Sequence, residues 1–187
     1  DDRPYRPAEI TVFSFGMAHK IQVDRFRRLR ELLDASGRSF TIYVSAANHE
    51  TASIRDAELV FNEMHEIFPN ELFFLGNLSD VAVANELRRS TFFAAFFPGG
   101  VRGNNTSVAS ALERGCMVIT NLDEYSPSEF VHMENVIDLD RCEQLPTDPL
   151  ACAQLKVRAM ETGRARGWDR LVAAVGDAGD RSARKAS

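Results

Sequence analysis

The sequence is poor in the features that mark membrane proteins, nucleic-acid-binding proteins and disulfide-rich proteins. Its 187 residues contain no apolar run near the roughly 20 residues of a membrane-spanning helix. Acidic residues outnumber basic ones, 27 to 22, so the net charge of −5 offers no general attraction to nucleic acid. The three cysteines lack metal-binding spacing, and their odd number argues against a disulfide framework. We therefore expect no transmembrane segment, no nucleic-acid partner, no metal site and a reducing, cytoplasmic location.

Familiar catalytic signatures are missing as well. The sequence has no G-x-S-x-G elbow, no Walker lysine and no H-E-x-x-H pair. The first apolar run is followed by a single glycine, Gly16, and not by G-x-G-x-x-G, which disfavours an NAD or FAD site. The catalytic residues therefore stay unknown at this stage.

Short apolar runs alternate with helical patterns along most of the chain. Because strands and helices that alternate at this spacing form βαβ units, the pattern predicts a parallel sheet. Runs such as FFAAFF, apolar at every position, indicate a sheet covered on both faces. The expected strands are 10–15, 40–44, 71–75, 92–97, 116–120 and 136–139, and the expected helices are 23–33, 54–68, 81–88, 106–114, 126–132, 149–160 and 168–175.

These elements predict one α/β domain over residues 9–175. We expect a single Rossmann-like, doubly wound parallel sheet of about six strands in the order 3-2-1-4-5-6, with helices on both faces. Residues 1–8 are charged and contain two prolines, which is typical of a lead-in segment or linker. Residues 176–187 are small and charged, and we expect a disordered tail.

The most informative stretch is 91–121, which runs from strand through a glycine loop and a helix into the next strand. The loop opens with Pro98-Gly99-Gly100, and small polar residues stand at the start of the helix that begins at Thr106. Unpaired N–H groups and the helix dipole make such an end attractive to a phosphate or diphosphate. In an open parallel sheet, ligands bind beyond the carboxyl ends of the strands. The loops expected to meet there are 16–20, 46–49, 77–79, 98–105 and 121–126.

Blocks spread over residues 10–175 resemble, in order, segments of one enzyme family. FGMAHK resembles its first glycine turn and lysine, FFLGNLSD its "v-x-F-x-G-x-v-s-d" segment, and SALERGCMVITN its "E-A-M-A-x-G-x-P-V-I-x" block. HMENVIDL and GWDRLV resemble the end of its binding region and its tail helix. The chain thus resembles the C-terminal, donor-binding domain of a GT-B fold glycosyltransferase, closest to the family 4-like group.

The resemblance implies transfer of a sugar from a nucleoside-diphosphate donor to an unknown acceptor, without a cofactor or metal. It implies a diphosphate site, a base and ribose pocket, and contacts to the donor sugar. The expected diphosphate residues are Gly16, Lys20, Arg102, Gly103, Asn104, Asn105, Thr106 and Ser107; the base and ribose residues are Asn77, Leu78 and Ser110; the sugar contacts are His19, Asp123 and Glu124.

The sequence also departs from the family pattern. Two glutamates that family members carry eight residues apart are replaced by Arg102 and Ser110, and we expect the arginine to form a bidentate contact to a phosphate or to a carboxylate. A GT-B enzyme works between two domains, so this chain, which opens with Asp1 and not Met, is expected to lack its N-terminal domain or to need a partner subunit, and to be inactive alone. Two alternatives stay open: a non-catalytic nucleotide- or phosphosugar-binding module acting with a partner, and a GT-B-like sugar-nucleotide epimerase or hydrolase.

Overall fold

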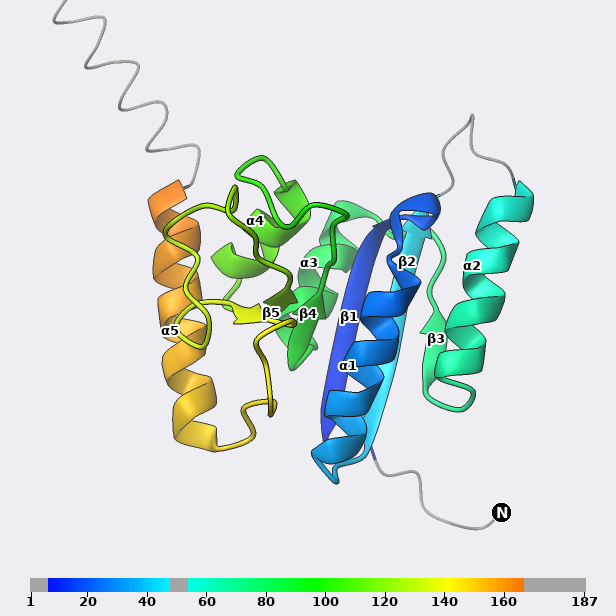
Figure 1. The fold of residues 1–187 in the computed structure, drawn as a ribbon, viewed down its shortest axis with the longest axis horizontal. Coiled ribbons are helices and arrows are strands. Elements are labelled where there is room, and N and C mark those ends of the chain that lie inside the picture. Colours follow the sequence, from blue (N-terminus) through cyan, green and yellow to red (C-terminus); the bar gives the residue numbers. More distant parts are fainter. Residues whose placement is uncertain (1–6, 48–53, 167–187) are drawn as a thin grey trace, which may run out of the picture.

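The computed structural model describes residues 7–47 and 54–166 and has one six-stranded, all-parallel sheet (Figure 1). The strand order is β3-β2-β1-β4-β5-β6, which confirms the predicted Rossmann-like order. Connections from β1 run outward in both directions, so the order reverses between β1 and β4. The strands are β1 (Ile10–Met17), β2 (Phe40–Ala47), β3 (Leu72–Phe74), β4 (Phe92–Ala94), β5 (Met117–Thr120) and β6 (Ile137–Asp138).

Helices cover both faces of the sheet. In the view of Figure 1, α1 and α2 lie in front of the strands. The apolar residues of α1 and α2 pack with one face of the sheet, and those of α3 and α4 pack with the other. The helices are α1 (Val23–Ala35), α2 (Ile54–Ile67), α3 (Asp80–Arg89), α4 (Thr106–Glu113) and α5 (Pro149–Arg166), with a short 3₁₀ helix, η1, at Ala18–Lys20.

Burial of successive side chains explains why the strand sequences are apolar throughout. Neighbouring residues on a strand point to opposite faces, and both faces of this sheet are covered. Phe92 packs on the α1–α2 side and Phe93 on the α3–α4 side, and both side chains are fully buried. The continuous apolar runs therefore reflect two core layers that share one sheet.

Local signals set the helix ends next to the site. The Ser79 side chain caps α3 by accepting a hydrogen bond from the N–H of Ala82 at 3.3 Å, as the sequence predicts. At the end of α4, Gly115 has φ +67°, a conformation that favours glycine, and Cys116 N–H returns to the Ala111 carbonyl at 3.0 Å. α4 is thus a short helix bounded by the glycine loop and β5.

The predicted helix over 126–132 is wrong: this segment forms turns. Pro127 is a favourable first helical residue, but the buried Asn135 side chain takes over the backbone groups that a helix would pair. Its Oδ1 accepts from Val131 N–H at 2.9 Å and its Nδ2 donates to the Glu129 carbonyl at 2.7 Å. These side-chain bonds favour the turns over a helical ladder.

Other boundaries differ more modestly. β4 ends at Ala94, not at residue 97, because the Phe97 backbone turns away to pair with the Asn121 side chain. α5 continues to Arg166, six residues beyond the prediction. The three cysteines are free thiols, as the composition indicated. The predicted helix at 168–175, the tail, residues 1–6 and rim residues 48–53 lie outside the described residues.

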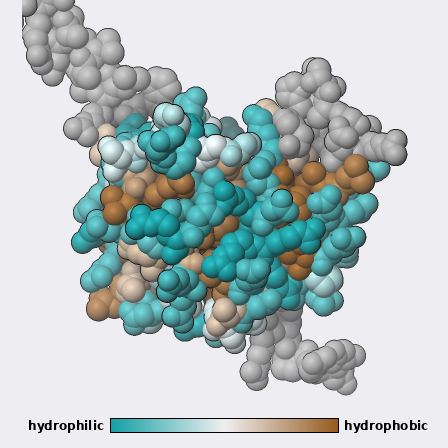
Figure 2. Space-filling model, in the orientation of Figure 1, coloured by the Kyte–Doolittle hydropathy of each residue, from teal (hydrophilic) through white to brown (hydrophobic). Residues whose placement is uncertain are grey.

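The surface seen in Figure 2 is mostly hydrophilic, with hydrophobic residues interspersed. Exposed apolar side chains on α2 and the β3 edge include Leu59, Phe73 and Phe74. None of the helices in the described part of the chain is long and apolar enough to cross a membrane.

Candidate functional site

Two adjoining cavities open at the carboxyl end of β1, where the strand order reverses. They have volumes of about 540 and 620 Å³. This is the edge at which open parallel sheets bind ligands. The two cavities share a set of lining residues from β1, β2 and the start of α4: Phe15, Gly16, Met17, Ser45, Thr106 and Ser107.

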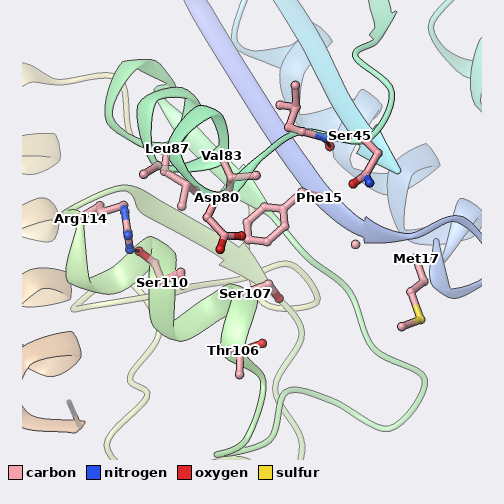
Figure 3. Close-up of a pocket in the computed structure, with 14 residues that line it drawn as sticks. Phe15, Met17, Ser45, Asp80, Val83, Leu87, Thr106, Ser107, Ser110 and Arg114 are labelled. Atoms are coloured by element: carbon pink, nitrogen blue, oxygen red, sulfur yellow. Dashed lines mark hydrogen bonds between the residues drawn. The ribbon is translucent and has the colours of Figure 1, made fainter. Parts of the chain in front are cut away.

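The smaller cavity, here called the α3–α4 groove, lies between two helices (Figure 3). One wall is a single face of α3, formed by Asp80, Val83, Ala84 and Leu87. The other wall is a face of α4, on which Ser110 and Arg114 follow Thr106 at four-residue spacing. The buried Ser45 hydroxyl shapes the rim, because it donates to the Gly76 carbonyl at 2.8 Å and accepts from Leu78 N–H at 3.4 Å.

The larger cavity, here called the Lys20 cavity, lies on the other side of the β1 end. Lys20, from η1, is the only charged residue among the described residues that line it. Gln22 and the apolar rings of Phe26 and Phe96 line its inner part, and Asn104 and Asn105 close it toward α4. The cavity therefore combines one cation with a helix start and an apolar wall.

The start of α4 has backbone donors without protein partners. The Asn105 side chain does not cap the helix; its Oδ1 accepts from Arg102 N–H at 2.5 Å instead. Within the described residues, no hydrogen bond uses the N–H groups of Thr106, Ser107 or Val108. Unpaired donors at a helix start are suited to an anion.

The glycine loop is fastened to the end of β5 by Asn121, whose side chain is buried. Phe97 N–H donates to Asn121 Oδ1 at 2.9 Å, Asn121 Nδ2 donates to the Phe97 carbonyl at 2.8 Å, and Val101 N–H donates to the Asn121 carbonyl at 2.9 Å. Gly100 lies so close to Asp123 that a Cβ there would be 2.7 Å from the carboxyl carbon. The loop thus needs glycine at this position.

Arg102 of the glycine loop and Asp123, which follows β5, form a bidentate ion pair. Arg102 Nη1 and Nη2 lie 2.7 and 2.8 Å from the two carboxylate oxygens. The hydrogen bond from Arg102 holds the pKa of Asp123 below its usual value, and the bond to Asp123 raises the pKa of Arg102. The guanidinium also lies 5.6 Å from the Tyr125 ring centre. Neither member of the pair lines either cavity.

The expected site residues are divided between the cavities. Six of the expected diphosphate residues line the Lys20 cavity, and the three expected base and ribose residues line the α3–α4 groove. Among the others, Arg102, Gly103, Asp123 and Glu124 line neither cavity, and the Gly103 carbonyl accepts from Arg166 Nη2 at 2.9 Å. The side chain of His19 is outside the description. Ligand binding by all these residues stays a prediction.

Two charged residues of the groove were not expected from the sequence. Asp80 and Arg114 are not among the site residues that the sequence predicts, yet both line this groove. The spacing of the sequence could have predicted the place of Arg114, because it follows Ser110 by four residues and residues at that spacing lie on the same face of a helix. Within residues 7–47 and 54–166, no group of three or more His, Cys, Asp or Glu side chains could hold a metal ion.

Comparison with known proteins gives a structural likeness only. No protein-family model and no curated protein sequence matches the chain. It is similar to the C-terminal domain of the glycosyl transferase group 1 family protein LpcC from Francisella tularensis, with 12% identity over 83% of this chain and 84% of that one, at a TM-score of 0.61.

Two longer structures match the chain over part of their own length. HepE from Anabaena, solved with UDP and glucose, is 13% identical, with 84% of this chain and 44% of that one covered, at a TM-score of 0.64. Sucrose-phosphate synthase from Thermosynechococcus elongatus is 13% identical, with 97% and 47% covered, at a TM-score of 0.70. The chain therefore spans less than half of these two proteins, and its fold is that of the C-terminal domain of GT-B glycosyltransferases.

Proposed function

We propose that the chain is the donor-binding domain of a glycosyltransferase and holds a nucleoside-diphosphate sugar. One observation carries the proposal: Thr106 and Ser107, whose N–H groups have no partner in the described part of the chain, line the same cavity as Lys20 at the carboxyl end of β1. A diphosphate needs donors and positive charge, and both are present there. The donor is a substrate, so no further cofactor is part of the proposal.

The chemistry asked of this site is electrostatic. When the bond between the sugar and the diphosphate breaks, negative charge grows on the phosphate oxygens. Fixed amides and a lysine stabilise that charge without having to reorganise. Gly16 lies beside open space, since no protein atom comes within 4 Å of the position that a Cβ would take. Because glycine has no side chain, a ligand in this space can approach the backbone closely.

The similar structures supply a suitable probe and an expectation about the rest of the enzyme. HepE was solved with UDP and glucose, and the O-GlcNAc transferase GtfA with UDP and GlcNAc. Since the chain spans less than half of such proteins, we expect a second GT-B domain or a partner subunit to supply the acceptor site and the catalytic base.

One observation favours the second candidate, a module that binds a nucleotide or phosphosugar without transfer. Arg102 stands where the family pattern has a glutamate that contacts the donor sugar, and its guanidinium is engaged by Asp123 outside both cavities. The epimerase or hydrolase alternative has less support, because among described side chains Asp80 is the only carboxylate lining the cavities and no histidine lines them.

The first test is thermal denaturation of the chain with increasing UDP or UDP-glucose. A ligand at about 100 times its Kd adds about 2.7 kcal/mol to the stability of the folded form, so the melting temperature should rise. Lys20→Ala should weaken binding about tenfold, because it removes a charge-assisted contact. Arg89→Ala, an exposed cation of α3 away from both cavities, is the matched control. No shift with any nucleotide or nucleotide sugar at millimolar concentration would contradict the proposal.

A second measurement separates the two candidates. The longer protein that contains this domain, or the chain with its partner subunit, is incubated with UDP-glucose and candidate acceptors, and UDP release is followed. Acceptor-dependent release supports the transferase. Binding without release across the panel supports the non-catalytic module.

A further inference from the structure

The two cavities differ in charge, and this difference predicts which end of a bound nucleotide lies in which cavity. Among the residues that the structure describes, the lining of the Lys20 cavity has one cation and no carboxylate, whereas the α3–α4 groove contains Asp80 and Arg114. A diphosphate is attracted to the uncompensated charge of Lys20, whereas in the groove the charge of Arg114 is offset by that of Asp80. If the proposed function holds, the nucleoside therefore occupies the groove.

Asp80 has the properties of a ligand-binding carboxylate. It is the first residue of α3, is exposed, and projects into the groove opposite the α4 wall (Figure 3). No hydrogen bond or ion pair among the described residues involves its side chain. Its acceptor oxygens are thus free, and it is the only described carboxylate that lines either cavity.

The α4 wall offers the complementary chemistry. Ser110 presents only a short hydroxyl, and one turn later Arg114 Nη1 donates to the Ser110 carbonyl at 3.0 Å. The buried Arg114 Nε has no partner within the described part of the chain. The α4 wall therefore carries no carboxylate among its described residues, and the charged acceptor that a pair of sugar hydroxyls needs lies across the groove, on α3.

We infer that Asp80 is a specificity-determining residue that accepts hydrogen bonds from the ribose hydroxyls of the nucleotide. Carboxylates are well suited to this task, because an ionised oxygen accepts strongly from two neighbouring hydroxyls. The inference rests on the proposed function and deepens it: it places recognition of ribose on α3 and not on α4, where Ser110 was expected to lie against it.

The test is a comparison of ribose with deoxyribose ligands. Isothermal titration gives the Kd of the chain for UDP, for 2′-deoxy-UDP and for 3′-deoxy-UDP. We expect UDP to bind about tenfold or more tightly than at least one deoxy form, because a hydrogen bond to a charged group is lost. Asp80→Asn should bring the ratio close to one, while the affinity for the deoxy form changes little.

Asp24→Asn is the matched control. Asp24 is also an exposed acidic residue in the first turn of a helix, α1, but it lines neither cavity. Both substitutions remove a favourable charge at a helix start, so both should cost similar stability. Only Asp80→Asn should change the ratio of affinities.

Each result of this experiment either supports or overturns the role of Asp80. Equal affinity of the unmodified chain for UDP and both deoxy forms overturns the inference and leaves the proposed function standing. A preference for ribose that persists in Asp80→Asn also overturns it. No binding of any nucleotide overturns the proposed function and the inference together. If Asp80→Asn fails to fold, Asp80→Glu and the deoxy comparison on the unmodified chain still give the answer.

Discussion

At the scale of single residues, a buried amide decides where the glycine loop lies. Asn121 is 3% exposed and pairs with both backbone groups of Phe97. A buried amide that is fully paired fixes a geometry, and losing it leaves the partner groups unsatisfied. The loop that forms the cavity rim is therefore part of the end of β5, not an independent flap.

His132 makes the stability of the same region depend on pH. Its Nδ1 accepts from Asp138 N–H at 3.0 Å, which requires the neutral ring. Burial, and next the charge of Arg141, lower its pKa below the ordinary value, although Asp138 acts in the opposite direction. The folded form therefore resists protonation more than the unfolded chain does.

We predict that stability falls as the pH drops below about 6.5, the ordinary histidine pKa, and goes on falling down to the lower pKa of the folded form. Above that range the contribution of His132 is fully present. Urea unfolding between about pH 7 and pH 5 should show this slope reduced in His132→Gln, because glutamine does not titrate there. His65→Gln, on the exposed side of α2, is the control. An unchanged slope in His132→Gln would contradict the prediction.

At the scale of elements, α4 depends on α5. Gly163 of α5 is buried against α4, and a Cβ there would lie 2.5 Å from the backbone nitrogen of Glu113 and 2.8 Å from its Cα. Because these neighbours are backbone atoms, no side chain can move aside. The close approach of the two helices therefore fixes the position of the C-terminal end of α4.

Gly163→Ala should therefore destabilise the protein. Overpacking costs about 1–3 kcal/mol, which outweighs the gain of up to about 1 kcal/mol in helix propensity. UDP affinity should fall as well, because α4 is displaced. Urea unfolding and calorimetric titration measure both effects, and Glu161→Ala, exposed on the same helix, should stay within about 0.5 kcal/mol of the unmodified chain. A more stable Gly163→Ala would show that the helices can separate freely.

Elements were more predictable than contacts between loops. FFAAFF and MVIT indicated buried strands because both faces of the sheet are covered, a property that the sequence displays directly. Residues 126–132 could not be predicted, because Asn135, outside the segment, competes for its backbone groups. The Arg102–Asp123 pair was equally hidden, since 21 residues separate its members. Asp80 and Arg114 were missed because charges at helix ends have a sufficient local role.

At the scale of the whole molecule, two core layers share one sheet. Phe93 belongs to the layer under α3 and α4, and Leu29 to the layer under α1. The four central strands, β2, β1, β4 and β5, contribute side chains to both layers, so neither layer can unfold while the sheet stays intact. We expect a single cooperative unfolding transition.

Substitutions in either layer should therefore lower the same transition. Phe93→Ala should cost about 3–5 kcal/mol and Leu29→Ala about 2–5 kcal/mol. Calorimetry and far-ultraviolet circular dichroism should give coincident curves in both variants. Two separate transitions, each sensitive to one substitution, would show that the layers unfold independently.

Arg166 ties the glycine loop to the last described turn of α5. Its guanidinium lies 5.0 Å from the Phe130 ring centre, pairs with Glu129 and reaches the Gly103 carbonyl, 63 residues earlier in the chain. A protein trimmed just ahead of this arginine would keep its interior packing yet lose a contact that holds the glycine loop. If the proposed function holds, we expect a change that bends the end of this helix to shift the glycine loop and to lower the affinity for the nucleotide.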